Sequence, residues 1–165
     1  MDTTPAETGD CRTLVDGQPG LRCRNTQEQK RNLVMNAKNE SVALLEKQHF
    51  RFENSRFNNV VAHGGSRPIL TCRVVEARRE TAVNFIDFAV VPVGGDIGIH
   101  THSEDNEEVY IIISGQGEMV LDGRKLTVGP GHVVVNRPGG THGLKNTGST
   151  DLRLVVIEVP VTASR

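Results

Sequence analysis

From Pro68 onward, the chain alternates short apolar runs with turns rich in glycine and proline. Short runs rich in β-branched residues are typical of strands, and their regular punctuation predicts an all-β fold, an antiparallel sandwich or barrel. Asp122-Gly123 lies between two of these runs and predicts a two-residue hairpin. The predicted strands are Ile69–Val75, Ala82–Val91, Glu108–Ile113, Glu118–Leu121, Lys125–Val128, His132–Val135 and Leu152–Val159.

The first part of the chain has a different composition. Residues 1–31 are polar, and their only apolar pair is Leu14-Val15. Because such a segment cannot pack a core of its own, we expect an extended N-terminal arm or tail, followed by a single domain over residues 32–165. Within residues 32–66 the pattern predicts one helical turn at 41–46 and extended pieces near 49–52 and 59–61.

The charge composition argues against a nucleic-acid partner. The chain has 19 basic and 20 acidic side chains and a net charge of −1, so no basic excess is available to hold a phosphate backbone. No apolar run reaches the ~18 residues that a membrane span requires. The N-terminus lacks the basic start and apolar stretch of a secretory leader. We therefore expect a cytoplasmic protein that binds neither nucleic acid nor membrane.

The cysteines give no disulfide framework. Cys11, Cys23 and Cys72 are an odd number at spacings that match no known pattern. Free thiols in a reducing compartment are the expected state. A bridge between Cys11 and Cys23, or a role in metal binding, stays open as an alternative.

A cluster of candidate metal ligands follows the Gly94-Gly95 turn. Side chains two residues apart on a strand share a face, with Cα atoms about 6.6 Å apart, so His100 and His102 can point at one ion. A carboxylate precedes the next apolar run, and His142 follows a Pro-Gly-Gly turn. Three imidazoles and one carboxylate are a good ligand set for a divalent transition metal.

Two adjacent glutamates compete for the role of the carboxylate ligand. We choose Glu108 over Glu107, because the register of the strand is fixed by the residues after the glutamate in the sheet. The inward face then carries Glu108, Tyr110 and Ile112, and the loop after His102 absorbs one extra residue.

These residues resemble the two sequence motifs of the cupin superfamily over about residues 68–160. The first usually reads G-x5-H-x-H, three or four residues, then E-x6-G, and the second reads G-x5-P-x-G-x2-H-x3-N. Here they read Gly94-x5-His100-x-His102-x5-Glu108-x6-Gly115 and Gly131-x5-Arg137-Pro138-Gly139-x2-His142-x3-Asn146. The chain departs from the pattern in the longer loop before Glu108 and at Arg137, which replaces a proline and is a candidate to bind an anionic substrate.

The resemblance implies a double-stranded β-helix, a small jelly-roll barrel that commonly forms a homodimer. It implies that His100, His102, Glu108 and His142 hold one divalent ion, without choosing among Fe, Ni, Mn, Zn, Co and Cu. We expect His49, His63 and His132 to be surface or hydrogen-bonded residues and Asn146 to be structural. Tyr110, which shares the face of Glu108, is a candidate general acid, although a core role is the simpler interpretation.

Two functions are compatible with such a site. The first is a metal-dependent enzyme acting on an oxygen-bearing small molecule, by isomerase, cyclase or lyase chemistry or, with a redox metal, as a dioxygenase. The alternative is a non-catalytic domain that binds a sugar-like small molecule. The fold alone does not decide between them.

Overall fold

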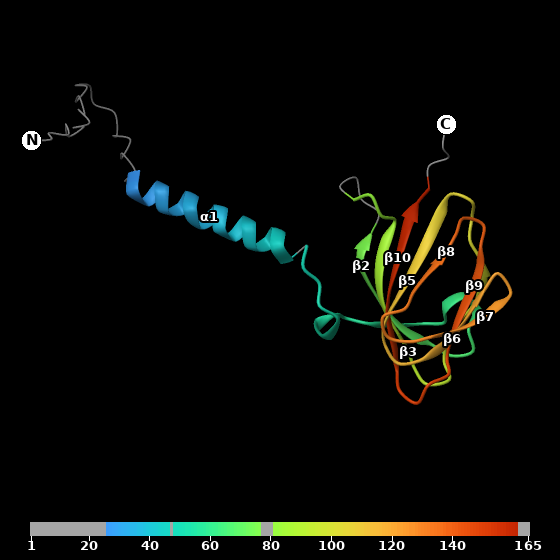
Figure 1. Ribbon diagram of the computed structural model, residues 1–165. Coiled ribbons are helices and arrows are strands. Elements are labelled where there is room, and N and C mark those ends of the chain that lie inside the picture. The colour runs from blue at the N-terminus through green and yellow to red at the C-terminus, as the bar shows by residue number, and fades with distance from the viewer. Residues whose placement is uncertain (1–25, 47, 77–80, 162–165) are drawn as a thin grey trace, which may run out of the picture. The chain divides into compact units, whose positions relative to one another are not determined.

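The computed structural model describes residues 26–46, 48–76 and 81–161. The chain divides into two units, residues 1–48 and 49–165. In the first, helix α1 runs from Thr26 to Glu46 (Figure 1) and contains neither glycine nor proline. The single turn predicted at 41–46 is therefore only the end of a longer helix. Residues 26–31, expected in the polar arm, form its start, and residues 1–25 lie outside the described ranges.

The sequence analysis predicted only one turn of helix α1, because the apolar residues of the helix do not form a stripe along one face. Most of its residues are charged, amide-bearing or small, and several are strong helix formers by intrinsic propensity. Leu33, Val34 and Met35 are exposed in consecutive positions rather than at helical spacing. No helix in the described part of the chain is long and apolar enough to cross a membrane.

The described part of the second unit contains ten strands and two short 3-10 helices. The 3-10 helices are η1 (Phe52–Asn54) and η2 (Ala62–Gly64). The strands are β1 (Asn58–Val60), β2 (Ile69–Glu76), β3 (Phe85–Val91), β4 (Asp96–Thr101), β5 (Asn106–Ser114), β6 (Gly117–Leu121), β7 (Arg124–Val128), β8 (Val133–Asn136), β9 (Thr141–Asn146) and β10 (Leu152–Pro160).

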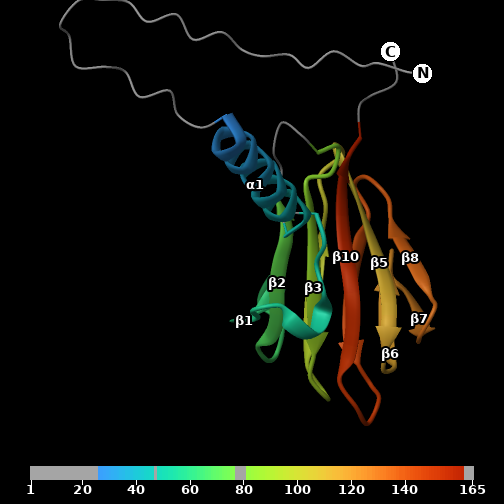
Figure 2. The ribbon, with the colours of Figure 1, turned by 90° about the vertical axis from the view of Figure 1, so that its left-hand side faces the viewer.

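The strands form two antiparallel sheets, which confirms the predicted all-β jelly-roll barrel (Figures 1 and 2). One sheet has the order β1-β2-β3-β10-β5-β8, and Figure 2 shows its strands β2, β3, β10, β5 and β8 side by side. The other has the order β4-β9-β6-β7. Because chain neighbours such as β4 and β5 belong to different sheets, residues from both sheets meet in the interior.

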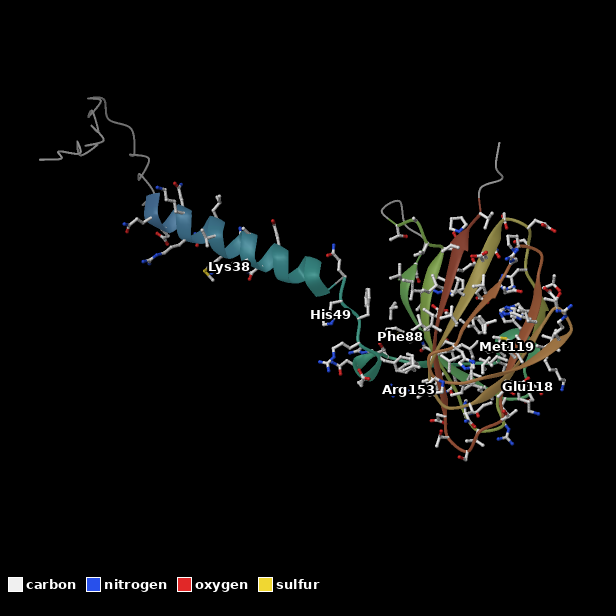
Figure 3. The ribbon with its side chains drawn as sticks, in the orientation of Figure 1. Lys38, His49, Phe88, Glu118, Met119 and Arg153 are labelled. Carbon is white, nitrogen blue, oxygen red and sulfur yellow. The ribbon has the colours of Figure 1, made fainter. Side chains whose placement is uncertain are left out.

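The core lies between the sheets and follows the period-two alternation of the strands. On β6, Met119 is fully buried, whereas its neighbour Glu118 points outward and pairs with Lys125 on β7 (Figure 3). The fully buried apolar side chains come from both sheets and include Ile69, Val91, Ile112, Met119, Val128, Leu144, Leu152 and Leu154.

Strands with an apolar inward face were predicted well, and strands with a polar inward face were not. The hairpin at Asp122-Gly123 is confirmed, with both φ angles positive at 48° and 76°. Strand β9 was not predicted, because its buried positions include His142, Gly143 and Asn146 and only one aliphatic residue, Leu144. His142, on the inward face of β9, belongs to the candidate metal centre.

Candidate metal centre

Strand pairing brings the candidate ligands together. His100 on β4 and His142 on β9 are direct partners across the ladder, and His102 follows the end of β4. Glu108 comes from β5 in the opposite sheet. One ligand atom from each of the four side chains lies within 4.8 Å of the others. The structure therefore places all four residues of the predicted set at one point between the sheets.

The four ligand atoms have the spacing of donors around a single ion. The Nε2 atoms of His100, His102 and His142 lie 3.1 Å from one another. Glu108 Oε2 lies 3.0 Å from His142 Nε2 and 3.3 Å from His102 Nε2. Two donors that meet a metal ion at about 2.1 Å and at nearly right angles are about 3 Å apart. The arrangement matches that separation.

Hydrogen bonds behind two of the histidines fix their tautomers. His100 Nδ1 lies 2.9 Å from the Gly98 carbonyl oxygen, and His102 Nδ1 lies 2.9 Å from Asn106 Oδ1. The Asn106 amide is oriented by its Nδ2, which donates to Ser103 Oγ at 3.0 Å. Since both partners are acceptors, each Nδ1 carries the proton and each Nε2 presents a lone pair to the centre. Converging lone pairs repel unless a cation lies between them, as it does in metal sites with this outer support.

Glu108 adds a second indication of a cation site. Its side chain is buried, and Oε2 accepts no hydrogen bond from the described part of the chain. Its direct partner on β10 is Glu158, and like charges in opposed positions of neighbouring strands are destabilising. A divalent ion would satisfy the Glu108 oxygen and offset the repulsion. The donor set of three nitrogens and one oxygen thus fits a divalent transition metal, without selecting one.

The register of β5 separates the two glutamates as predicted. Glu108, Tyr110 and Ile112 are buried, whereas Glu107 is only partly covered. The extra residue of the loop is taken up in a turn around Glu104 and Asp105, before β5 begins.

Electrostatics keep His100 neutral. Burial lowers the pKa of its imidazole to about 4; the Gly98 carbonyl opposes this, and the neighbouring imidazoles of His142, His63 and His102 lower it further. Neutral imidazole is the form that binds a metal.

Tyr110 lies against the cluster and remains protonated. Burial raises the pKa of its phenol well above the usual value, and the charge of Glu108 and a hydrogen bond to it raise the pKa further. Its ring centroid is 5.0 Å from that of His142. The sequence offered a core role and an acid role for Tyr110, and its position is compatible with both.

His63 is exposed, as expected for a surface residue, but it also contacts the candidate site, which the sequence analysis missed. Its ring stacks on His100 with centroids 3.5 Å apart and planes 3° from parallel. It occupies η2 with a positive φ of 50°. The backbone of His63 lies close to Gly98 on β4, which only glycine permits, since a Cβ on Gly98 would lie 2.1 Å from the His63 carbonyl oxygen. A single histidine between Ala62 and Gly64 does not indicate a contact with His100. Only the nearby glycines could have indicated that two backbone segments approach closely here.

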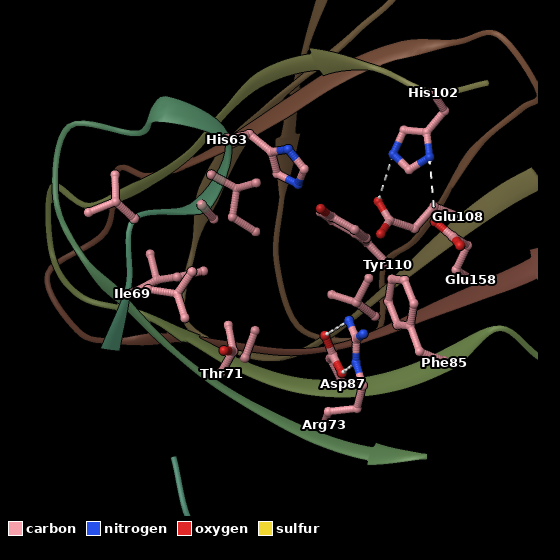
Figure 4. A pocket seen from close by; sticks show the side chains of 16 residues that line it. His63, Ile69, Thr71, Arg73, Phe85, Asp87, His102, Glu108, Tyr110 and Glu158 are labelled. Carbon is pink, nitrogen blue, oxygen red and sulfur yellow. Dashed lines mark hydrogen bonds and ion pairs between the residues drawn. The ribbon is translucent and has the colours of Figure 1, made fainter. Parts of the chain in front are cut away.

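A cavity of about 450 Å³ opens beside the cluster. In Figure 4, His63, His102, Glu108 and Tyr110 surround one side of it, and the ion pair of Arg73 with Asp87 lies across from them. The remaining walls are mainly aliphatic and come from β1, η2, β2, β3, β4 and β10: Val60, Val61, Ala62, Ile69, Ala89, Ile97 and Val156.

Two further residues singled out in the sequence lie away from the ligand atoms. Asn146 is buried and structural, as expected: its Nδ2 donates to the carbonyl oxygens of Val91 and Thr150, and its Oδ1 accepts from the Gly148 amide. Arg137 is exposed and does not line the cavity. The structure thus gives no support for Arg137 as a substrate-binding residue.

Of the three cysteines, only Cys72 belongs to the described part of the chain. Its thiol is free, as expected, and it is not a member of the ligand cluster. Cys11 and Cys23 lie outside the described residues, so a bridge between them stays open as an alternative.

Comparisons with known proteins give the same picture of the second unit. Residues 87–158 match the family model described as a cupin domain. An uncharacterized protein of Methanocaldococcus jannaschii is 35% identical over 72 residues, 44% of this chain and 57% of that protein. A Thermotoga maritima protein named oxalate-binding protein is 33% identical over 67 residues, 41% of this chain and 54% of that protein. The chain thus spans little more than half the length of these curated relatives.

Solved structures support the fold. A T. maritima protein described as a predicted oxalate decarboxylase superposes with a TM-score of 0.65 at 21% identity, covering 68% of this chain and 99% of that one. Identity at this level bears on the fold alone. Residues 87–158 therefore match the cupin domain in sequence and in fold, and His100, His102, Glu108 and His142 all lie within this cupin domain.

Proposed function

We propose that this protein is a metal-dependent enzyme that acts on an oxygen-bearing small molecule. One observation carries the proposal: three imidazole nitrogens and the orphaned oxygen of Glu108 converge beside a cavity of about 450 Å³. Four protein ligands leave one or two positions on an ion that accepts five or six, whereas structural zinc sites are closed by four. A ligand in the cavity would therefore have access to the ion.

The chain's own residues have distinct parts in this proposal. His100, His102, Glu108 and His142 hold the ion, which when bound supplies Lewis acidity toward a carbonyl or enolate oxygen. Tyr110 can donate a hydrogen bond or a proton at the same side of the cavity. The aliphatic walls make part of the cavity apolar, which strengthens electrostatic interactions along them. Isomerase, cyclase and lyase reactions use this combination, and a redox metal would allow dioxygenase chemistry instead.

The second candidate is a domain that binds a small molecule without turnover. The relative from T. maritima that is named for oxalate binding favours it. The two candidate functions share the metal site and differ in the role of Tyr110. In an enzyme, Tyr110→Phe would lower the rate by about 100-fold or more at unchanged ligand affinity. A binding domain would show neither turnover nor this separation of rate from affinity.

The first experiment is elemental analysis of protein purified without chelator or nickel affinity, alongside two variants. We expect one divalent transition metal ion per chain in the wild type and in His132→Ala, a matched control because His132 is exposed and outside the cluster. His100→Ala should lose the metal and remain folded. A wild type that takes up no metal after reconstitution with each candidate ion, or a His100→Ala variant that keeps it, would refute the proposed site.

A further inference from the structure

The lining of the cavity specifies a class of ligand, an inference that rests on the proposed metal site. Residues of β3, β10 and β5 that face the cavity are aligned across the sheet. Asp87 and Tyr110 are both direct partners of Val156, one on each side. Since neighbouring strands lie about 4.8 Å apart, the Cα atoms of Asp87 and Tyr110 are about 10 Å apart. The cavity therefore has a metal end and an opposite end at Asp87.

The charges around the cavity disfavour an anionic ligand of high charge. The described lining residues include three carboxylates, Asp87, Glu108 and Glu158, and one guanidinium, Arg73. A divalent ion at the ligand cluster brings the lining close to neutral. A dianion would then leave the cavity with two uncompensated negative charges, and uncompensated charge in a partly buried site is costly.

Arg73 already pairs with Asp87, which reduces its capacity to neutralise an acidic group on a ligand. Its Nε and Nη2 donate to the two oxygens of Asp87 at 2.9 Å and 3.0 Å, a bidentate pair. Its guanidinium carbon lies 4.2 Å above the ring centre of Phe85. The contacts with Asp87 and Phe85 hold the guanidinium in one position, and the carboxylates remain the acceptors at this end.

Glu158 adds acceptor capacity between the two ends. Its Oε1 accepts a hydrogen bond from Asn84 Nδ2 at 3.1 Å. Its Oε2 is 3.8 Å from His102 Nδ1, which is longer than a hydrogen bond. An oxygen in this position attracts a donor on a ligand and repels an acid. The aliphatic walls around it favour a carbon skeleton, and the volume exceeds what a molecule the size of oxalate can fill.

We propose that the site takes a neutral or singly charged ligand with two adjacent oxygens that reach the metal end. A ring or carbon skeleton of this ligand fills the aliphatic middle of the cavity. A hydroxyl or amine at its other end donates to the carboxylates at the Asp87 end. Hydroxy-ketones and enolisable ring ketones with a distal hydroxyl belong to this class. Oxalate and other small dianions do not.

Three probes test the proposal by calorimetry at one pH, on protein loaded with the metal that elemental analysis identifies. Kojic acid is a hydroxypyranone with a distal hydroxymethyl group. Comenic acid has the same chelating ring with a carboxylate in place of the hydroxymethyl, and oxalate is the small dianion. We expect kojic acid to bind at least about tenfold more tightly than either, which corresponds to about 1.4 kcal/mol.

A variant tests whether Asp87 causes the preference for kojic acid over comenic acid. Asp87→Asn removes one negative charge and one of the carboxylate oxygens that hold Arg73, so the advantage of kojic acid over comenic acid should fall several-fold. Asp151→Asn is the matched control, because Asp151 is exposed and outside the cavity lining, and it should leave the preference unchanged.

The outcomes separate this proposal from the metal site itself. Metal-loaded protein that binds oxalate or comenic acid as tightly as kojic acid, or that binds none of the three, would overturn the ligand class and leave the metal site standing. An equal preference in wild type and Asp87→Asn would overturn the part assigned to Asp87. Failure to load any metal would refute the proposed function, and this inference would fall with it.

Discussion

At the scale of single residues, the site depends on partners that are not ligands. Asn106 and the Gly98 carbonyl fix the tautomers of His102 and His100, and His63 covers the outer face of the His100 ring. In metal sites such outer partners orient the ligands and keep their free nitrogen toward the ion. Two asparagines allow the metal-binding and structural contributions to be separated.

Asn106→Ala should weaken metal binding without unfolding the protein. The substitution removes the acceptor of the His102 Nδ1 proton, and the loss of such a partner typically costs 10- to 100-fold in metal affinity. Competitive titration with a chromogenic chelator measures the change. An affinity within twofold of the wild type would show that Asn106 does not orient His102.

Asn146→Ala should lower the stability of the protein and leave its metal affinity unchanged. The substitution removes the side-chain partner of the buried Val91 carbonyl oxygen and the part-buried hydrogen bonds with Thr150 and Gly148, which costs about 1–3 kcal/mol in the free energy of unfolding. Urea denaturation measures this loss. Metal affinity of the folded fraction should stay close to that of the wild type. A variant as stable as the wild type would contradict the structural role of Asn146.

At the scale of elements, the approach of η2 to β4 shapes the cavity. η2 is joined to β4 through Gly65, Gly98 and the hydrogen bonds of Ser66 with Asp96. A Cβ on Gly65 would lie 2.4 Å from the Asp96 carbonyl oxygen. Only glycine permits this backbone contact, which brings His63 over His100 and Val61 and Ala62 to the cavity wall.

Gly98→Ala should displace η2 from β4. The new Cβ would meet the backbone of His63, which cannot rotate away as a side chain can. We expect a loss of several kcal/mol in stability, or a folded protein whose cavity is open on the side of η2. Gly123→Ala is the control: it meets no atom within 4 Å, and only its positive φ costs about 1 kcal/mol. Equal thermal stability of the two variants would refute the proposed packing.

At the scale of the whole molecule, we expect a homodimer. The edge strand β8 and its neighbour β5 expose Ile113, Val133 and Val135, a row of apolar side chains at the edge of the six-stranded sheet. Such an edge is prone to association unless it is covered. A second copy of the chain would cover it by pairing the same edge.

Light scattering after size exclusion tests this expectation. The wild type should elute as a particle of about twice the 18.0 kDa chain mass. Val133→Lys should shift it toward the monomer, whereas Leu126→Lys, an exposed apolar residue on the edge strand β7 of the other sheet, should not. A monomeric wild type would refute the homodimer, and a dimeric Val133→Lys would move the interface elsewhere.

The sequence by itself determined the barrel and the four side chains of the candidate metal site. Alternating apolar residues and turn glycines are local signals, so strands such as β5, β6 and β10 and the hairpin at Asp122-Gly123 could be predicted from neighbouring residues alone. Motif spacing singled out His100, His102, Glu108 and His142, and strand periodicity chose Glu108 over Glu107. Side-chain period along a strand is a property of the backbone and needs no tertiary contact.

Only the tertiary structure decided what surrounds the ligands. Helix α1 and strand β9 lack an apolar pattern, so neither gave a local signal of its full length. The stack of His63 on His100 and the alignment of Asp87 with Tyr110 join residues far apart in sequence. Contacts of this kind arise from sheet pairing and close backbone approach, which depend on the whole barrel. The four clustered side chains could therefore be predicted from the sequence, whereas the cavity beside them could not.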